Sequence, residues 1–199
     1  DVNESYSYWT FGDVFEELGV PFTPFHGGFG LVANGCITKP TFWTFAFYKK
    51  LEESEANCVY KDDNIVVLKR ANGDYLGVAW NIARKSTEQG KEKMLLEFTF
   101  PAEQEEYCFL TKTVDEETCN PLKVWHDMGD PANLSEEQTK LIRESSRPFV
   151  KTERKKQEDG NICVELPVNK NGVVYFELNA GKVNPDRGYD YDRVVSLKA

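Results

Sequence analysis

The chain has 199 residues, of which 40% are hydrophobic and 13% aromatic, so it can bury one large core or two small ones. Its 33 acidic and 24 basic residues give a net charge of −9 at pH 7. This balance disfavours nucleic acid and anionic membrane surfaces as partners, because both are bound through concentrated basic surfaces. A neutral ligand is not excluded by the charge.

The cysteine and histidine contents argue against a metal site or a redox motif. The only two histidines, His26 and His126, are far apart, and the cysteines are odd in number with no CxxC pair. We therefore expect no metal, no cofactor, reduced and mostly buried thiols, and a cytoplasmic location. No apolar run approaches the roughly 18 residues of a membrane helix. The cysteines are Cys36, Cys58, Cys108, Cys119 and Cys163.

The first fifty residues predict a strand, a long loop and a helix. Residues 5–11 (SYSYWTF) are typical of an aromatic strand, and independent domains rarely begin so abruptly, so we expect a piece of a larger protein. The glycine- and proline-rich residues 11–32 predict an ordered loop of the kind that is often functional. Lys39-Pro40-Thr41 opens a helix that ends near Leu51. The first two turns of this helix have almost no polar face, so we expect it to be buried on several sides.

From residue 55 onward the pattern changes to short strands. Residues 64–70 and 75–83 flank Asn72-Gly73, the strongest short hairpin signal. Strands at this spacing predict an antiparallel β-sandwich. One helix interrupts them, because Ser135 and Gln138 form a capping box and Pro148 follows. The other predicted strands are residues 94–100, 107–113, 162–166 and 173–178, the last two joined by a turn at residues 169–172.

Three segments resemble the β-xylosidase family of glycoside hydrolases, family 39. Residues 8–31, YWTFGDVFEELGVPFTPFHGGFGL, resemble the last barrel strand of that family and the loop after it, with Gly12 where many relatives have serine. Residues 39–42 (KPTF) resemble the start of the last barrel helix. Residues 123–138 (KVWHDMGDPANLSEEQ) resemble a helical insertion within the accessory sandwich.

The resemblance implies a fold and a domain division. It implies a mainly β chain: an antiparallel β-sandwich accessory domain with a short helical insertion, preceded by the last β-α unit of a (β/α)8 barrel. Residues 1–54 would be the remnant of the catalytic barrel and residues 55–199 the accessory sandwich. In such barrels the active site lies at the C-terminal ends of the strands, which places residues 12–38 in an active-site loop.

The resemblance also implies which chemistry is present. Retaining glycosidases use two carboxylates, and the family places them after the fourth strand and at the seventh strand; neither motif occurs here, so we assign no catalytic residue and expect the chain alone to be inactive. Trp9 would be the aromatic platform under a xylose ring, and Glu17 would accept hydrogen bonds from sugar hydroxyls. The weaker substrate-binding candidates are Phe11, Glu16, Asp13 and His26, the last in a loop that shapes the entrance.

Two other functions compete with this hypothesis. The sandwich alone could be a non-catalytic carbohydrate-binding or scaffolding module, although its aromatic residues are scattered. The iduronidase branch of the same family is disfavoured, because residues 9–31 contain no lysine or arginine for a substrate carboxylate. The expected partner is a xylose-containing saccharide. We also expect a homo-oligomer, because the apolar face of the helical insertion has no obvious strand partner and is available to a neighbouring subunit. In addition, a chain without its barrel would expose apolar surface, so we expect it to self-associate or to rearrange residues 1–35.

Overall fold

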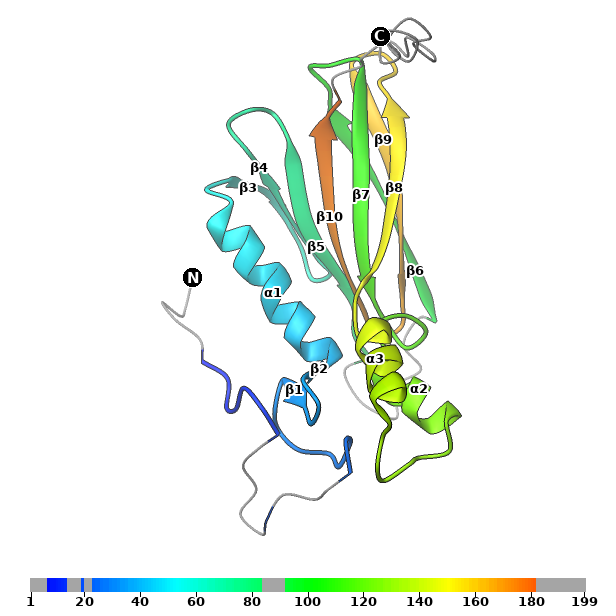
Figure 1. Ribbon diagram of the computed structural model, residues 1–199. Helices are drawn as coiled ribbons and strands as arrows, with labels where there is room; N and C mark the ends of the chain where they lie inside the picture. The colour runs from blue at the N-terminus through cyan, green and yellow to red at the C-terminus, as the bar shows by residue number, and fades with distance from the viewer. Residues whose placement is uncertain (1–6, 14–18, 20–22, 84–91, 182–199) are drawn as a thin grey trace, which may run out of the picture.

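The computed structural model describes residues 7–13, 19, 23–83 and 92–181, and it is mainly β, as predicted. Its largest element is an antiparallel sheet with the strand order β3-β4-β5-β10-β7-β8 (Figure 1). Strands β6 (Lys93–Pro101) and β9 (Asn161–Asn169) pair with each other in a second sheet. The strands of the large sheet are β3 (Asn57–Lys61), β4 (Ile65–Lys69), β5 (Tyr75–Asn81), β7 (Glu106–Val114), β8 (Phe149–Lys156) and β10 (Gly172–Ala180).

The two sheets enclose the main core. Strand β9 contributes alternate side chains to this core: every second side chain from Ile162 to Val168 is buried, and the residues between them are exposed. Phe98 of β6 stacks over Phe176 of β10 with ring centroids 6.1 Å apart. At the centre of the large sheet, Gly77 leaves room for the Phe176 ring, since a Cβ there would lie 2.4 Å from it.

Helix α1 (Pro40–Glu53) covers the opposite face of the large sheet. Phe47 stacks on Tyr175 of β10 at 5.4 Å, and Leu51 joins the same cluster. The helix position was predicted correctly; burial on several sides was expected for a helix packed on both barrel and sandwich, and in the described part of the chain only the sheet covers it. Only Phe47 and Leu51 are buried, while Tyr48 is 45% exposed, because the sheet covers one face of the helix and leaves the other open.

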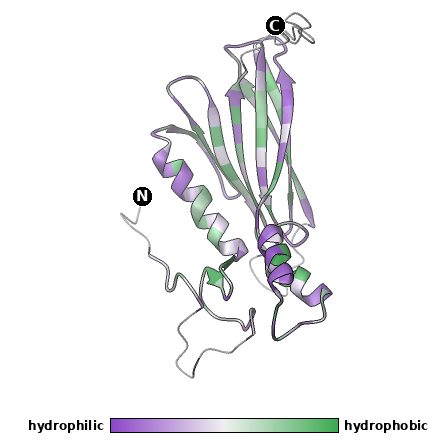
Figure 2. Ribbon diagram, viewed as in Figure 1, coloured by the Kyte–Doolittle hydropathy of each residue, from purple (hydrophilic) through white to green (hydrophobic). Residues whose placement is uncertain are grey.

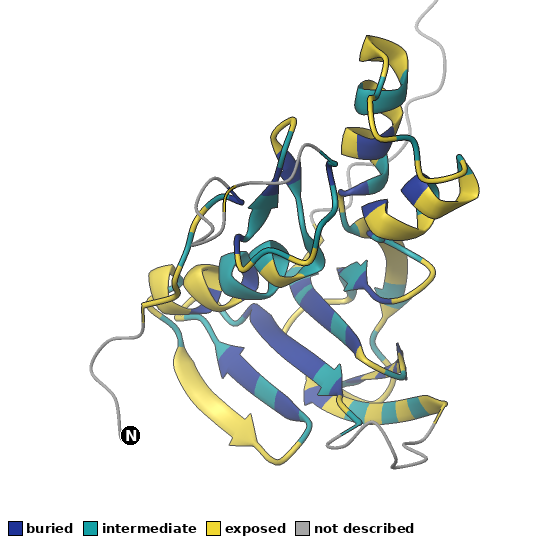
Figure 3. Ribbon diagram, turned by 90° about the horizontal axis from the view of Figure 1, so that it is seen from below, coloured by how far each residue is buried: buried dark blue, intermediate teal, exposed yellow. Residues whose placement is uncertain are grey.

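A third cluster joins the short hairpin β1 (Val32–Ala33)–β2 (Ile37–Thr38) to helices α2 (Pro121–Asp127) and α3 (Glu136–Ser145) at one end of the molecule. Its buried members are Ala33, Ile37, Trp125 and Ile142. Figure 3 shows the two helices projecting from the sheets.

The Ser146 carbonyl oxygen accepts hydrogen bonds from three separate segments at this end of the molecule. It accepts hydrogen bonds from the Trp43 indole N–H at 2.6 Å, the Thr38 hydroxyl at 3.3 Å and the Cys119 thiol at 3.1 Å. One buried acceptor after α3 therefore links helix α1, strand β2 and the segment before α2.

Several local predictions were confirmed and others were wrong. The hairpin β4–β5 and the capping box of Ser135 with Gln138 are both present. The predicted strand at residues 5–11 is absent over residues 7–11, because pairing there is limited to two backbone hydrogen bonds from residues 31–32, next to the bridge of Gly12 with Val32. The thiols were expected to be mostly buried, yet only Cys119 is; the other four cysteines are exposed. Edge strands β3 and β8 were not predicted.

Candidate functional site

Three large aromatic side chains near the start of the described chain are exposed to solvent. Trp9 is 73% exposed, Phe11 68% and Phe29 65%. Residues 10–13 run parallel to residues 31–32, through hydrogen bonds from Leu31 N to Thr10 O (3.2 Å) and from Val32 N to Phe11 O (2.9 Å). The backbone that carries Trp9 and Phe11 is thus anchored to the hairpin β1–β2. Exposed aromatic faces of this size are characteristic of recognition surfaces.

Buried contacts of the Asp13 carboxylate stabilise the loop. Its carboxylate is fully buried; Oδ1 accepts hydrogen bonds from Gly30 N at 2.7 Å and Lys39 Nζ at 2.9 Å, and Oδ2 lies 2.7 Å from Lys39 Nζ. Lys39 also donates to the Gly28 carbonyl at 2.8 Å. A Cβ at Gly30 would lie 2.4 Å from Asp13 N, so only glycine fits there. We therefore place Asp13 in the support of the loop, since its oxygens already have partners within the chain.

The other predicted site residues divide into two groups. Glu16 and Glu17 lie outside the described residues. His26 is partly buried and faces a cavity of about 370 Å³. This cavity is bordered by residues 25–27, by residues 39–41 at the start of α1, and by α2 on the other side. We call it the loop–α2 cavity.

The loop–α2 cavity brings together both histidines of the chain. Trp125 contributes to its wall, packs against Phe25 with ring centroids 5.6 Å apart, and donates its indole N–H to the Pro131 carbonyl at 3.0 Å. His126 borders the same cavity and pairs with Asp130 one turn later. The sequence separates His26 from His126 by 100 positions, and only packing of the hairpin β1–β2 against α2 and α3 brings their segments together.

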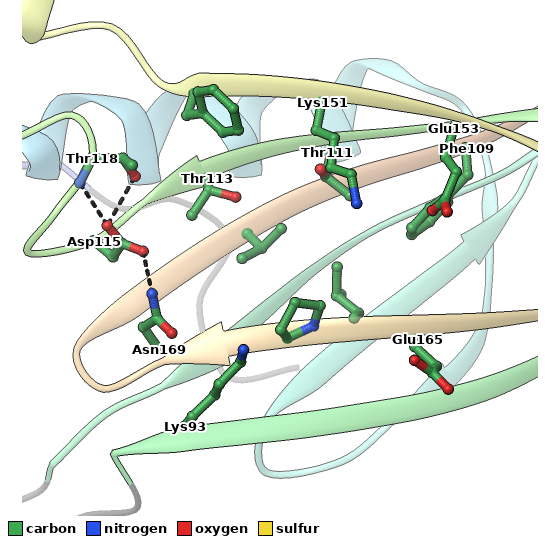
Figure 4. Close-up of a pocket in the computed structure, with 14 residues that line it drawn as sticks. Lys93, Phe109, Thr111, Thr113, Asp115, Thr118, Lys151, Glu153, Glu165 and Asn169 are labelled. Carbon is green, nitrogen blue, oxygen red and sulfur yellow. Dashed lines mark hydrogen bonds between the residues drawn. The ribbon is translucent and has the colours of Figure 1, made fainter.

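A second cavity, of about 260 Å³, opens between strands β7–β8 and strand β9 (Figure 4). At one end Asp115 accepts hydrogen bonds from the Thr118 backbone N–H and hydroxyl, at 2.7 and 2.8 Å, and from Asn169 Nδ2 at 2.8 Å. Thr111 and Thr113 of β7 contribute to its walls. The neighbouring strand β8 adds the side chains of Lys151 and Glu153. Edge strand β8 is largely hydrophilic (Figure 2), so this cavity is polar on its outer side.

Sequence reasoning missed three residues of this region. Phe29 sits inside the FHGGFGL motif, and its exposure could have been suspected from the glycines around it. Lys39 was noticed only as a helix start, although it is the partner of Asp13. Leu122 of α2 borders the loop–α2 cavity and is 42% exposed, a position that no local pattern indicates.

Two further properties of the described residues bear on function. They contain no cluster of three or more His, Cys, Asp or Glu side chains placed to hold a metal ion. Among them, too, no helix has the length and apolarity that crossing a bilayer requires.

Comparison with known proteins gives a consistent result. Residues 1–163 match the model of glycosyl hydrolases family 39. A β-xylosidase of Geobacillus stearothermophilus is 35% identical over 178 residues, which are 89% of this chain and 34% of that protein. A β-xylosidase of Caldicellulosiruptor saccharolyticus is 31% identical over 182 residues, or 88% of this chain and 36% of the relative. The chain thus spans about a third of the length of the curated relatives it matches.

Solved structures agree with the sequence relatives. The GH39 enzyme from Xanthomonas axonopodis pv. citri superimposes with a TM-score of 0.71 at 25% identity, covering 88% of this chain and 37% of the other. A GH39 β-xylosidase from Caulobacter crescentus gives a TM-score of 0.64 at 27% identity, covering 87% of this chain and 35% of the other.

Proposed function

Because this chain belongs to glycosyl hydrolases family 39, we propose that it is the C-terminal part of a retaining glycosidase that releases xylose from β-xylosides and xylo-oligosaccharides. In this proposal residues 1–54 are the last unit of the catalytic (β/α)8 barrel, and residues 55–199 are the accessory β-sandwich. Names of relatives support the substrate class, since two of them at 31% identity or more are β-xylosidases.

The observation that carries the proposal is the exposure of Trp9. A pyranose presents C–H groups on its faces and hydroxyls around its rim, so it stacks on an accessible aromatic ring and turns its rim to polar side chains. Trp9 is 73% exposed on a backbone that hydrogen bonds anchor to the hairpin β1–β2. In the proposed pocket Trp9 is the floor under the xylose ring, Phe11 flanks it, and Glu17 accepts hydrogen bonds from the hydroxyls.

The bond-breaking groups lie outside this chain in the proposal. Double displacement requires one carboxylate as nucleophile and a second, about 5–5.5 Å away, as acid and base. In the family these belong to the fourth and seventh barrel strands, and residues 1–54 would supply only the eighth. The chain would therefore bind one side of the sugar and leave the chemistry to residues upstream.

An assay on 4-nitrophenyl β-xyloside tests the proposal. We expect no release of nitrophenol by the 199-residue chain and hydrolysis with retention of configuration by a protein extended upstream to include seven more barrel strands. Absence of xylosidase activity in the folded extended protein would contradict the proposal.

The second candidate is a non-catalytic carbohydrate-binding module, and the cavity between β7–β8 and β9, with its mixed polar and apolar lining, is the observation that favours it. Threonine hydroxyls and charged ends in one groove are suited to sugar hydroxyls. Retention of the isolated chain on insoluble xylan would support the module, whereas a purely scaffolding sandwich would pass through unretained.

A further inference from the structure

The loop–α2 cavity has the size and chemistry of a small-molecule site that the xylose pocket does not account for. Its volume of about 370 Å³ falls within the range of about 300–1,000 Å³ that ligand pockets occupy, and it is too small for a protein segment with secondary structure. Three separate parts of the chain form its walls: the loop of residues 25–27, residues 39–41 at the start of α1, and helix α2 with the residue before it. A cavity at such a junction is a common place for a ligand.

The walls of the cavity are mainly apolar. Phe25, Pro40, Pro121, Leu122 and Trp125 supply carbon surface from both sides. Leu122 is 42% exposed although it lies on the cavity side of α2, so part of the apolar wall remains accessible from solvent. Covering such surface with an apolar ligand is favourable because it removes apolar area from water.

The polar groups of the cavity carry little net charge. Among the described residues no carboxylate lines it. Of these residues, Lys39 alone brings a permanently charged side chain to the border, and the Lys39 charge is compensated by Asp13. The imidazoles of His26 and His126 also border the cavity, and His126 pairs with Asp130. This combination is suited to a neutral ring that carries one or two polar substituents.

We propose that the loop–α2 cavity binds the apolar, aromatic leaving group of a xyloside, next to the pocket for the xylose ring. The assignment rests on the proposed function for the identity of the sugar, while the cavity itself stands on its own geometry. Lys39 connects the two places, because it borders the cavity and its ammonium group pairs with Asp13, two residues after Phe11. Aryl xylosides would then be preferred over alkyl xylosides of the same sugar.

The two histidines allow a direct test on the chain itself. They are the only histidines in the 199 residues and both border the cavity, so their imidazole proton signals in an NMR spectrum report on this place alone. We expect both signals to shift on titration with 4-nitrophenyl β-xyloside, through the ring current of the nitrophenyl group, and to stay in place with methyl β-xyloside. An equal response to both compounds, or none to either, would overturn the proposal.

Two variants and a matched control separate the cavity from other binding places. Leu122→Glu puts a charge on the apolar wall and should weaken binding at least about tenfold, the equivalent of one lost apolar contact. Leu141→Glu makes the same change at a 52% exposed leucine of α3 outside the cavity and should leave the titration unchanged. Thr41→Glu adds a charge at the cavity in the first turn of α1. An acidic residue stabilises that end of a helix, so this variant should weaken binding while the chain stays folded.

The outcomes distinguish this proposal from that of xylosidase activity. Binding that Leu122→Glu and Thr41→Glu both abolish supports the cavity even if the extended protein has no activity on xylosides. Binding that neither variant weakens places the nitrophenyl ring elsewhere and refutes the cavity even if the extended protein is an active xylosidase.

Discussion

Asp13 has a carboxylate that solvent does not reach, and its two oxygens face Lys39 and the Gly30 amide. The pair is nearly buried, because the Lys39 side chain is only 19% exposed. Removal of one member of such a pair leaves the other desolvated and uncompensated, which costs far more than the loss of a surface pair.

Asp13→Asn should lower the free energy of unfolding by about 2–3 kcal/mol, somewhat below the usual cost for a completely buried pair. Urea denaturation followed by circular dichroism measures this difference. Glu136→Gln, which breaks the exposed pair of Glu136 with Lys140, is the control and should change stability by less than about 0.5 kcal/mol. Equal effects of the two substitutions would show that Asp13 does not hold the loop.

Cys119 is buried, whereas the other four thiols are exposed. Burial, and to a smaller degree the nearby negative charge of Asp115, raises the pKa of Cys119 to about 12. The thiolate is the reactive form, and at pH 8 a thiol with this pKa is almost entirely protonated. We expect a disulfide reagent at pH 8 to titrate four thiols in the folded chain and a fifth only after denaturation, with Cys119→Ala showing four under both conditions. Rapid labelling of all five in the folded chain would contradict the buried position.

Helix α1 shows at the scale of an element how one face of an apolar helix is used. Phe47 is 2% exposed and stacks on Tyr175, whereas its neighbour Tyr48 is 45% exposed. Phe47→Ala should destabilise the fold by about 3–4 kcal/mol, because the substitution leaves a cavity between helix and sheet. Tyr48→Ala should cost less than about 1 kcal/mol in the same denaturation experiment. Comparable losses would mean that a second body covers the outer face of the helix.

Elements with local signals could be predicted from the sequence. The Asn72-Gly73 turn and the Ser135 capping box each depend on residues within four positions, and both are present. Strand β8 (FVKTERKK) was not predicted, because an edge strand that faces water carries charges that mask alternation. Strand β3 (NCVYK) is short and exposed at every position, so no buried alternating side marks it in the sequence.

The candidate site required the fold. Trp9 was chosen from a family motif, and its exposure is a property of packing that no pattern in its own segment reveals. Asp13 was a weaker sugar-ligand candidate because of its place in the family motif, and no local pattern indicates its partner Lys39, which is 26 positions away in the sequence. The loop–α2 cavity depends on contacts across about 100 residues, which lie beyond any local pattern.

The exposed aromatic residues bear on whether the whole molecule self-associates. Tyr8, Trp9, Phe11 and Phe29 are 41–73% exposed and lie in one short stretch of sequence and its partner loop. Apolar surface of this kind promotes association. We expect sedimentation velocity to show a weight-average mass that rises with concentration, and a Trp9→Ser, Phe11→Ser, Phe29→Ser variant to remain monomeric. A monomer at every concentration would contradict this expectation; the homo-oligomer stays a prediction, as does the cytoplasmic location.

The most direct test of the proposed xylose pocket is the kinetics of Trp9→Ala in the protein extended upstream to the complete barrel. Loss of the aromatic floor should lower kcat/KM on 4-nitrophenyl β-xyloside by about 10- to 100-fold, the equivalent of about 1.4–2.7 kcal/mol. Trp9→Phe should recover part of this loss, and Tyr60→Ala, at a 52% exposed aromatic residue of edge strand β3, should leave the kinetics unchanged. A Trp9→Ala enzyme with unaltered kcat/KM would show that Trp9 does not line the sugar site.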